Sequence, residues 1–282
     1  MSLRLAFWNV GMGPRVRLAS AEREQGLVRA ADTVRELFEE EDVALVGLCE
    51  VDGLTAAAMS ERLHMQHAHI VVDEDVGRTQ WDLAVFFKTD RILCTKEHAC
   101  QIEERMQWIK AGYSFDVVDR ANSVTFALFL AHWPSRLSDQ KRAKAELAGD
   151  TLWYEVKRRL DDDKPVVVMG DFNDEPFDSS IQQRLRATRD PEHAAYYRAS
   201  RLYNPSWWLS CPAPGAPWAP FGSTSRQPEA YTNHHLLDQV LVSAHFLDKD
   251  ASIAPVCRRL PVPSSQSTGG RMSHIPIGVD LL

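Results

Sequence analysis

The sequence of 282 residues contains no hydrophobic run that approaches the ~18 residues needed to cross a membrane. Its first residues, MSLRLAFWNV, turn polar too soon for a secretory signal peptide. Acidic residues outnumber basic ones by 39 to 32, so the chain lacks the bulk positive charge with which many proteins grip nucleic acid. These absences predict a cytoplasmic protein without a membrane partner, although a local basic rim or a bound cation could still attract a polyanion.

The five cysteines form neither a CxxC pair nor the Cys/His spacing of a zinc site. Their odd number and the lack of a signal peptide argue against a disulfide framework and favour reduced thiols. Cys49 and Cys94 lie in apolar segments. We therefore expect both of these cysteines to be core residues.

The chain has an ordinary globular composition, with 44% hydrophobic and 25% charged residues. It shows no internal repeat and no linker that would divide it, which predicts a single domain over residues 1–282. Apolar residues at three- and four-residue steps predict helices over Ala21–Glu41 and Asp139–Leu160. Short apolar runs predict strands at Leu3–Val10, Val43–Leu48, His69–Val72, Leu83–Phe87, Arg91–Cys94, Asn122–His132, Pro165–Met169, Leu236–Ser243 and Ile275–Leu281.

Polar side chains recur where these predicted strands end. The set comprises Asn9, Glu50, His132, Asp171, Asn173, Asp238 and His274. Residues at strand ends converge on one edge of a sheet and build a site there. Carboxylate and amide oxygens suit Mg²⁺ or Mn²⁺, whereas histidines move protons near neutral pH. Together these groups favour the hydrolysis of a phosphate ester.

The motifs that carry these residues are FWN, LCE, AHW, GDFND, LDQVLVS and SHIP, in that order along the chain. In this order they resemble the endonuclease/exonuclease/phosphatase superfamily, which includes pancreatic-type deoxyribonuclease, abasic-site endonucleases, inositol polyphosphate 5-phosphatases and neutral sphingomyelinases. The segments HWPSR, GDFNDEPF and LYNPSWW further resemble an uncharacterised bacterial subgroup. The resemblance implies an α/β fold, a four-layer α/β sandwich of two packed mixed β-sheets flanked by helices.

The resemblance also implies roles for the polar residues. Glu50 would bind the Mg²⁺ or Mn²⁺ ion, with Asn9 beside it. Asp171 and Asn173 would orient the attacking water and the phosphate, and His132 would contact a phosphate oxygen. The catalytic and substrate-binding set therefore centres on the GDFND and AHW motifs.

The remaining roles fall on the last two motifs and on one arginine. Asp238 would orient His274, which would act at the scissile phosphate. Arg136 follows His132 in a loop, where we expect it to bind phosphate. Ser273 occupies the position of an aspartate in the usual Ser-Asp-His-x-Pro motif of the superfamily. Its lack of charge could weaken metal binding and shift the acid–base balance of the neighbouring histidine.

Plainer interpretations compete with some of these assignments. GDFND could be a simple strand-to-turn boundary, because Gly, Asp and Asn all favour turns. His132 could be a hydrogen-bonded core histidine, and His234 and His235 are expected on the surface. Three functions remain open: a nuclease that cuts DNA phosphodiesters, which we favour; a phosphatase or phosphodiesterase for a small molecule or lipid headgroup; and a catalytically weakened regulatory or binding protein.

Overall fold

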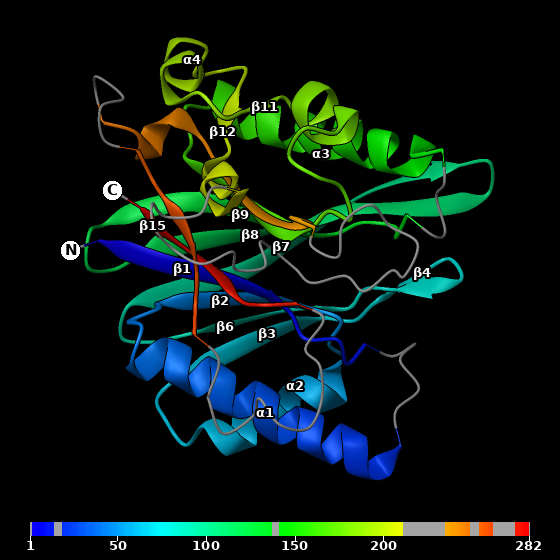
Figure 1. The fold of residues 1–282 in the computed structure, drawn as a ribbon, viewed down its shortest axis with the longest axis vertical. Coiled ribbons are helices and arrows are strands. Elements are labelled where there is room, and N and C mark those ends of the chain that lie inside the picture. The colour runs from blue at the N-terminus through cyan, green and yellow to red at the C-terminus, as the bar shows by residue number, and fades with distance from the viewer. Residues whose placement is uncertain are drawn as a thin grey trace.

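A computed structural model describes residues 2–13, 19–136, 141–210, 235–248, 254–261 and 274–281. Two β-sheets lie face to face at its centre, and helices cover their outer faces (Figure 1). The strand order is β14-β15-β1-β2-β6-β3 in one sheet and β11-β12-β13-β10-β9-β8-β7 in the other. This arrangement confirms the expected fold class, a four-layer α/β sandwich.

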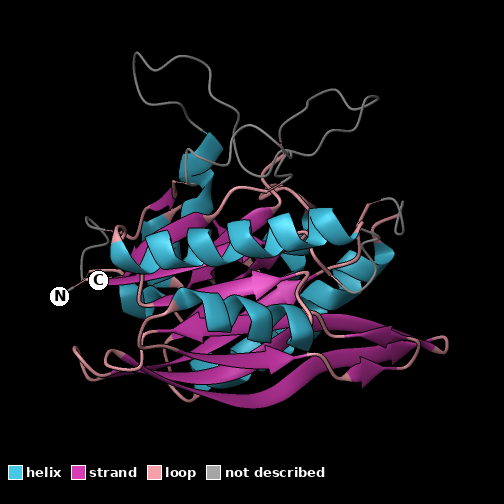
Figure 2. Ribbon diagram, turned by 90° about the horizontal axis from the view of Figure 1, so that it is seen from below, coloured by secondary structure: helices cyan, strands magenta, loops and turns pink. Residues whose placement is uncertain are grey.

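The first sheet is mixed, because β1 and β2 run parallel whereas β1 and β15 run antiparallel. Its strands are β1 (Leu3–Asn9), β2 (Leu45–Cys49), β3 (Ala68–Val72), β6 (Leu83–Phe87), β14 (Cys257–Arg259) and β15 (Ile277–Leu281). Two helices, α1 (Ser20–Glu39) and α2 (Gly53–Leu63), cover its outer face. Figure 2, turned from the view of Figure 1, shows these helices in front of the strands.

The second sheet is also mixed, with β9 and β10 parallel and β10 and β13 antiparallel. Its strands are β7 (Ile92–Glu104), β8 (Gln107–Asp119), β9 (Val124–His132), β10 (Val166–Asp171), β11 (Ala187–Thr188), β12 (Leu202–Tyr203) and β13 (Asp238–Val242). Helix α3 (Ala143–Asp161) packs on its outer face, and the short α4 (Pro191–Tyr196) lies near β11 and β12. A small hairpin of β4 (Asp75–Val76) and β5 (Thr79–Gln80) stands apart from both sheets.

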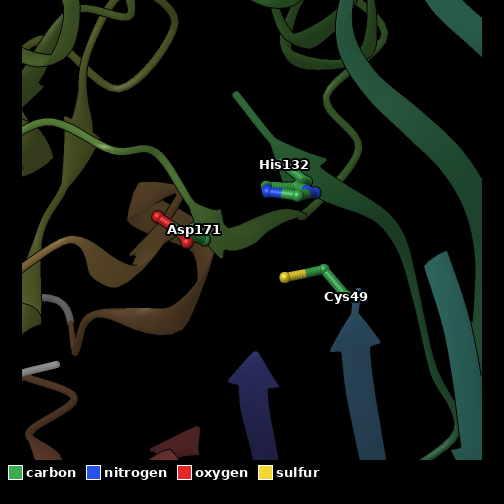
Figure 3. Close-up of side chains that lie close together, drawn as sticks. All are labelled: Cys49, His132 and Asp171. Atoms are coloured by element: carbon green, nitrogen blue, oxygen red, sulfur yellow. The ribbon is translucent and has the colours of Figure 1, made fainter. Parts of the chain in front are cut away.

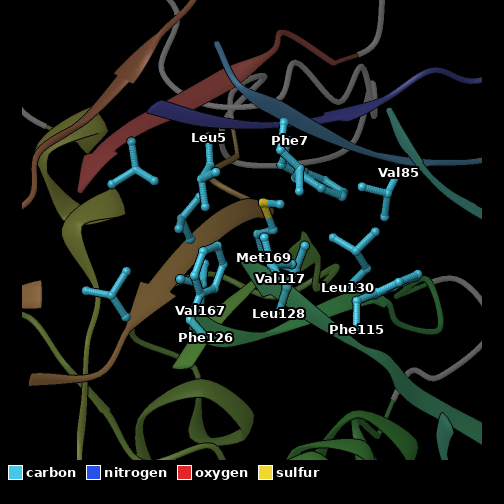
Figure 4. Close-up of a cluster of buried hydrophobic side chains, with 14 of the residues drawn as sticks. Leu5, Phe7, Val85, Phe115, Val117, Phe126, Leu128, Leu130, Val167 and Met169 are labelled. Carbon is cyan, nitrogen blue, oxygen red and sulfur yellow. The ribbon is translucent and has the colours of Figure 1, made fainter. Parts of the chain in front are cut away.

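The largest core lies between the two sheets (Figure 4). Leu5 and Phe7 of β1 face Val167 and Met169 of β10 across this layer. The alternate residues point outward: Trp8 packs beneath α1 and α2, for example, in a separate core. Because both faces of the central strands are largely buried, most of their residues are apolar, which is why the sequence reveals them.

The expected strands and helices are present with shifted ends, but several further elements were not predicted, among them β4, β5, β11, β12, β14 and α4. The predicted strand Arg91–Cys94 is the start of the much longer β7, and neither β8 nor α2 was predicted. The helix expected from Asp139 begins at Ala143 in the described residues, and Asp139 itself lies outside them. Among the helices that the structure describes, none is both long and apolar enough to cross a membrane.

Candidate active site

Strands of both sheets end at one edge of the sandwich and place the polar residues there. Asn9 at the end of β1 lies beside Cys49 at the end of β2. In the other sheet, Asp171 at the end of β10 lies between His132 of β9 and Asp238 of β13. The register of the strands therefore explains why residues from five separate motifs meet.

The backbone at this edge is adapted to its position. Gly170 comes directly before Asp171, and a Cβ atom there would collide with the carbonyl group of Ala131 in β9. Glu50 and Asn173 both adopt left-handed backbone conformations, with φ of 54° and 52°. Residues other than glycine rarely adopt this backbone conformation, and those that do often lie at functional sites. It turns the chain sharply just after β2 and β10.

Asn9 connects the two sheets through its side chain. Its Nδ2 atom donates to Glu50 Oε1 at 3.1 Å and to Asp171 Oδ2 at 2.9 Å. The other oxygen of Asp171, Oδ1, accepts a hydrogen bond from the backbone N–H of Asn173 at 2.9 Å. Asn9 and Asp171 are both 2% exposed. In this buried setting the hydrogen bonds hold the carboxylates of Glu50 and Asp171 in place.

His132 is held from one side by Asp82. Its Nδ1 atom donates to Asp82 Oδ2 at 2.8 Å, which leaves Nε2 directed toward Glu50 Oε1 at 3.8 Å. Burial alone would lower the pKa of His132, but the carboxylates of Asp82, Asp171 and Glu50 raise it to about 9. Burial raises the pKa of Asp82, yet His132 and Lys110 together hold it well below its usual range. His132 is therefore a cation at neutral pH in the absence of metal.

His274 and Asp238 form a second pair. Nδ1 of His274 donates to Asp238 Oδ2 at 2.8 Å, and Nε2 lies 3.9 Å from Asp171 Oδ2. Burial would lower the pKa of His274, but Asp238 and Asp171 raise it to about 9. Burial raises the pKa of the fully buried Asp238 to about 6 despite the hydrogen bond from His274. The second oxygen of Asp238, Oδ1, has no hydrogen-bond partner among the described residues.

The donor atoms of this cluster fit a hard divalent cation. Carboxylates of Glu50, Asp171 and Asp238 converge within one small region, and Glu50 is the most accessible of the three. A cluster of carboxylates this dense needs opposite charge, and hard oxygen ligands select Mg²⁺ or Mn²⁺ over softer ions. Glu50 beside the Asn9 side chain is the place where such an ion could be held and still reach a substrate.

A cleft with a volume of about 900 Å³ opens above the cluster. Glu50, Asp82 and His132 lie on its lining. One wall is the β4–β5 hairpin together with Trp108 and Lys110 of β8. The cleft thus leads from solvent to the groups described above.

Two further residues were expected in the site, Arg136 and Ser273. Arg136 donates from Nε to the backbone oxygen of Asn173 at 3.1 Å and forms ion pairs with Asp174, at 3.3 Å, and Asp178. Its guanidinium group therefore supports the loop that carries Asn173. Ser273 lies outside the described residues.

His235, expected on the surface, is partly exposed: its side chain is 18% exposed and its Nδ1 contacts Glu175 Oε1 at 3.0 Å. His234 lies outside the described residues.

Sequence reasoning missed Asp82, which accepts the hydrogen bond from His132. A usable signal was present, because Asp82 stands between Trp81 and the apolar strand β6, and a buried acid needs a partner. It also treated Cys49 only as a core residue, although the thiol lies beside His132 and Asp171.

Comparisons with known proteins agree with this geometry. The model of the endonuclease/exonuclease/phosphatase family matches residues 14–258. No curated protein matches the sequence. The fold is similar to that of the human Nocturnin catalytic domain with bound sulfate anion, with 17% identity and a TM-score of 0.63 over 100% of this chain and 94% of that one.

Two further solved structures have similar folds. A mannosyl-6-phosphatase from Bacteroides thetaiotaomicron has 15% identity and a TM-score of 0.66, with 100% of both chains covered. D. rerio TDP2, complexed with a single-strand DNA product, has 11% identity and a TM-score of 0.63 over 100% of this chain and 99% of that one. At these identities, the likeness shows the shared fold alone.

Proposed function

The chain belongs to the endonuclease/exonuclease/phosphatase family of metal-dependent phosphoester hydrolases, and on that premise we propose that it is a nuclease that cuts DNA phosphodiesters. The observation that carries the proposal is the open cleft above the cluster, because its wall combines cationic and aromatic side chains. Arg78, Lys110 and Lys144 line this cleft together with Trp108. Cations that follow a phosphate backbone and an aromatic ring that stacks on a base are the usual elements of a single-strand binding groove.

Trp108 is well placed for stacking. It is 38% exposed and packs over Gly77 of the β4–β5 hairpin, so one part of the ring is supported while another part faces the cleft. Stacking on an aromatic side chain contributes about 1–3 kcal/mol per base. The negative net charge of −7 disfavours long duplex DNA, which is why we favour a single strand or a strand end.

The residues of the cluster would act on the substrate in distinct ways. His132, a cation held by Asp82, would donate from Nε2 to a phosphoryl oxygen. Asp171, fixed by Asn9 and the Asn173 backbone, would accept a hydrogen bond from the attacking water. A divalent ion at Glu50 and Asn9 would neutralise charge on the phosphoryl group.

His274 would hold or move a proton at the reacting phosphate, in the orientation set by Asp238. Asn173 would steady a phosphate oxygen, and Arg136, paired with Asp174 and Asp178, would hold the loop that carries Asn173; a direct contact between Arg136 and the phosphate is the alternative that the sequence predicts.

A phosphatase or phosphodiesterase for a small molecule or lipid headgroup is the second candidate. The acids Glu50, Asp75 and Asp82 line the cleft together with its cations. Their negative charges repel a polyanion, so the cleft is less suited to binding a long nucleic-acid strand. One structure of similar fold is that of a mannosyl-6-phosphatase. A compact phosphate ester would need the metal and the histidines but not Trp108.

The experiment compares substrates and one cleft residue together. Single-stranded DNA, duplex DNA, RNA, a sugar phosphate and an inositol phosphate would be offered with Mg²⁺ or Mn²⁺, to the wild type and to Trp108→Ala. We expect cleavage of single-stranded DNA and a KM for it that rises about tenfold or more in the variant, in line with the loss of one stacked base. Tyr154→Ala, which removes an exposed aromatic side chain from α3, is the matched control.

Two outcomes would decide against the nuclease. Faster turnover of the sugar or inositol phosphate than of any DNA, with no effect of Trp108→Ala, would favour the small-substrate enzyme. No turnover of any substrate would favour the weakened regulatory or binding protein. In that case Ser273→Asp tests the sequence-based explanation, because restored activity would show that the missing carboxylate had weakened the site.

A further inference from the structure

Cys49 places a thiol next to two residues of the candidate active site, His132 and Asp171. It is the last residue of β2, is fully buried and forms no disulfide. Its Sγ atom, a ring nitrogen of His132 and a carboxylate oxygen of Asp171 lie within 4.8 Å of one another. Figure 3 shows the three side chains close together, each at the end of a different strand.

The two partners of the thiol are already oriented as metal ligands would be. Asp82 accepts a hydrogen bond from Nδ1 of His132 at 2.8 Å, so Nε2 is the nitrogen that remains. A carboxylate behind a histidine in this way fixes the ring and strengthens its free nitrogen as a ligand. Asp171 is fixed in turn by Asn9 and by the backbone of Asn173.

We propose that Cys49, His132 and Asp171 form a second metal site, specific for a thiophilic divalent cation such as Zn²⁺. This site differs from the hard-cation position at Glu50 in its sulfur ligand. Thiolate and imidazole favour Zn²⁺ and similar ions, whereas Mg²⁺ prefers oxygen ligands. The fourth ligand of a tetrahedral ion would be water or Glu50, whose Oε1 lies 3.8 Å from His132 Nε2.

The spacing of the donors suits such an ion after a small adjustment. Zn–S and Zn–N bonds of about 2.3 Å and 2.0 Å separate tetrahedral ligand atoms by roughly 3.5 Å. The three donor atoms lie no more than 4.8 Å apart, so rotations of the side chains would close the site. On binding, the thiol proton and the Nε2 proton pass to solvent, and the ion bonds to the resulting thiolate and neutral imidazole.

Occupancy of this site would inhibit hydrolysis, and this part of the inference rests on the proposed function. The ion would take Nε2 of His132 and an oxygen of Asp171, the same atoms that would contact phosphate and water. With Glu50 as the fourth ligand, it would also draw Glu50 away from the hard-cation position. The ion would enter through the cleft, because Glu50 and His132 both line it.

The binding experiment does not depend on activity. Cd²⁺ would be titrated into the chelator-treated full chain, while the ultraviolet absorbance of the thiolate-to-cadmium charge transfer is recorded. We expect one saturable equivalent in the wild type and its loss in Cys49→Ser. Cys94→Ser, which alters another buried thiol of the same core, should retain the signal. An unchanged signal in Cys49→Ser, or no signal in the wild type, would overturn the site.

A second variant keeps the test decisive if Cys49→Ser does not fold. His132→Gln preserves the thiol but removes the nitrogen ligand. Its Cd²⁺ affinity should fall by at least about tenfold, since even the loss of a residue behind a metal ligand typically costs 10–100-fold. Equal affinity in His132→Gln and the wild type would contradict the proposed ligand set.

The inhibition arm uses Zn²⁺ at fixed Mg²⁺, with each protein normalised to its own rate without Zn²⁺. Cys49→Ser should need at least about tenfold more Zn²⁺ for half inhibition than the wild type or Cys94→Ser. Equal sensitivity of Cys49→Ser and the wild type would refute the inhibitory role. A wild type that hydrolyses no substrate would refute the proposed function instead, and the Cd²⁺ titration would still decide whether the site exists.

Discussion

Asp171 and Asp238 lie directly opposite each other in the antiparallel register of β10 and β13, and His274 contacts both carboxylates. Two buried acids at this spacing repel each other unless a positive charge lies between them. The raised pKa of His274 supplies that charge at neutral pH in the absence of metal. The histidine is therefore part of the electrostatic support of the folded chain as well as a candidate proton carrier.

The first prediction concerns the pH dependence of stability in the presence of a chelator. The pKa of His274 rises from 6.5 to about 9 on folding, so its stabilising contribution is complete below pH 6.5 and is lost as the pH rises through 9. The unfolding free energy of the wild type, relative to an Asp238→Asn, His274→Gln double variant, should fall by up to about 3 kcal/mol between those limits. Urea denaturation at several pH values measures this difference.

The double variant is the proper comparison because His274→Gln alone would leave Asp238 buried without its partner. That carboxyl group would then titrate within the same pH window and obscure the result. His98→Gln, which removes a half-exposed histidine from β7, controls for unrelated effects. A constant difference between the wild type and the double variant over this window would show that His274 carries no extra charge in the folded state.

The second prediction concerns the hard-cation position. Glu50→Gln keeps the shape of the side chain and removes its charge, so Mn²⁺ affinity and hydrolysis should both fall by at least about tenfold while thermal unfolding changes little. Calorimetry with Mn²⁺ measures the affinity. Asp75→Asn is the matched control, since Asp75 lines the same cleft on the β4–β5 hairpin, away from the cluster. Equal losses in both variants would mean that Glu50 acts only through the general negative field of the cleft.

The central strands could be predicted because both of their faces are buried. Strands β1, β2, β6, β9 and β10 are largely apolar, and the polar residues near their ends mark the edge where the site lies. A strand that is buried on one face, or on neither, does not show such a series of apolar residues. Only three of the 13 residues of strand β7 are buried, and only its first residues were predicted.

The sequence did not predict the β7–β8 hairpin because its turn lacks the usual turn residues. Its two-residue loop is Arg105–Met106, and both residues have positive φ, at 50° and 61°. Such loops normally carry Asn-Gly or Asp-Gly, which is the sequence signal for a hairpin. Without that signal, the strand that positions Trp108 and Lys110 in the cleft could not be identified.

The candidate site was predictable as a list of residues but not as a network. Strand ends revealed Asn9, Glu50, His132, Asp171 and Asp238, because each ends or begins an apolar run. Asp82 was missed because its partner lies 50 positions away in the sequence, and only the packing of the two sheets brings them together. The proximity of Cys49 to the cluster depends on the register of β1 and β2 in the same way.

The third prediction concerns Gly170, which precedes Asp171. A methyl group at this position would collide with the backbone carbonyl of Ala131, and backbone cannot move aside as a flexible side chain can. Gly170→Ala should therefore destabilise the protein by about 1–3 kcal/mol, the usual cost of overpacking, and displace Asp171. Denaturant unfolding measures the loss. Gly26→Ala on α1, where the nearest neighbour is the flexible Met12 side chain, should be neutral or stabilising.

The last prediction concerns Arg136, whose guanidinium group contacts Asp174, Asp178 and the backbone oxygen of Asn173. If its main effect is to hold the Asn173 loop, Arg136→Gln and Asp178→Asn should both lower kcat and change KM little, because each loosens the same loop. If it mainly binds phosphate, Arg136→Gln should raise KM, whereas Asp178→Asn should lower KM by freeing the cation. We expect the first pattern, because two carboxylates already neutralise the guanidinium charge. Opposite shifts in KM for the two variants would instead support the direct contact between Arg136 and phosphate that the sequence predicts.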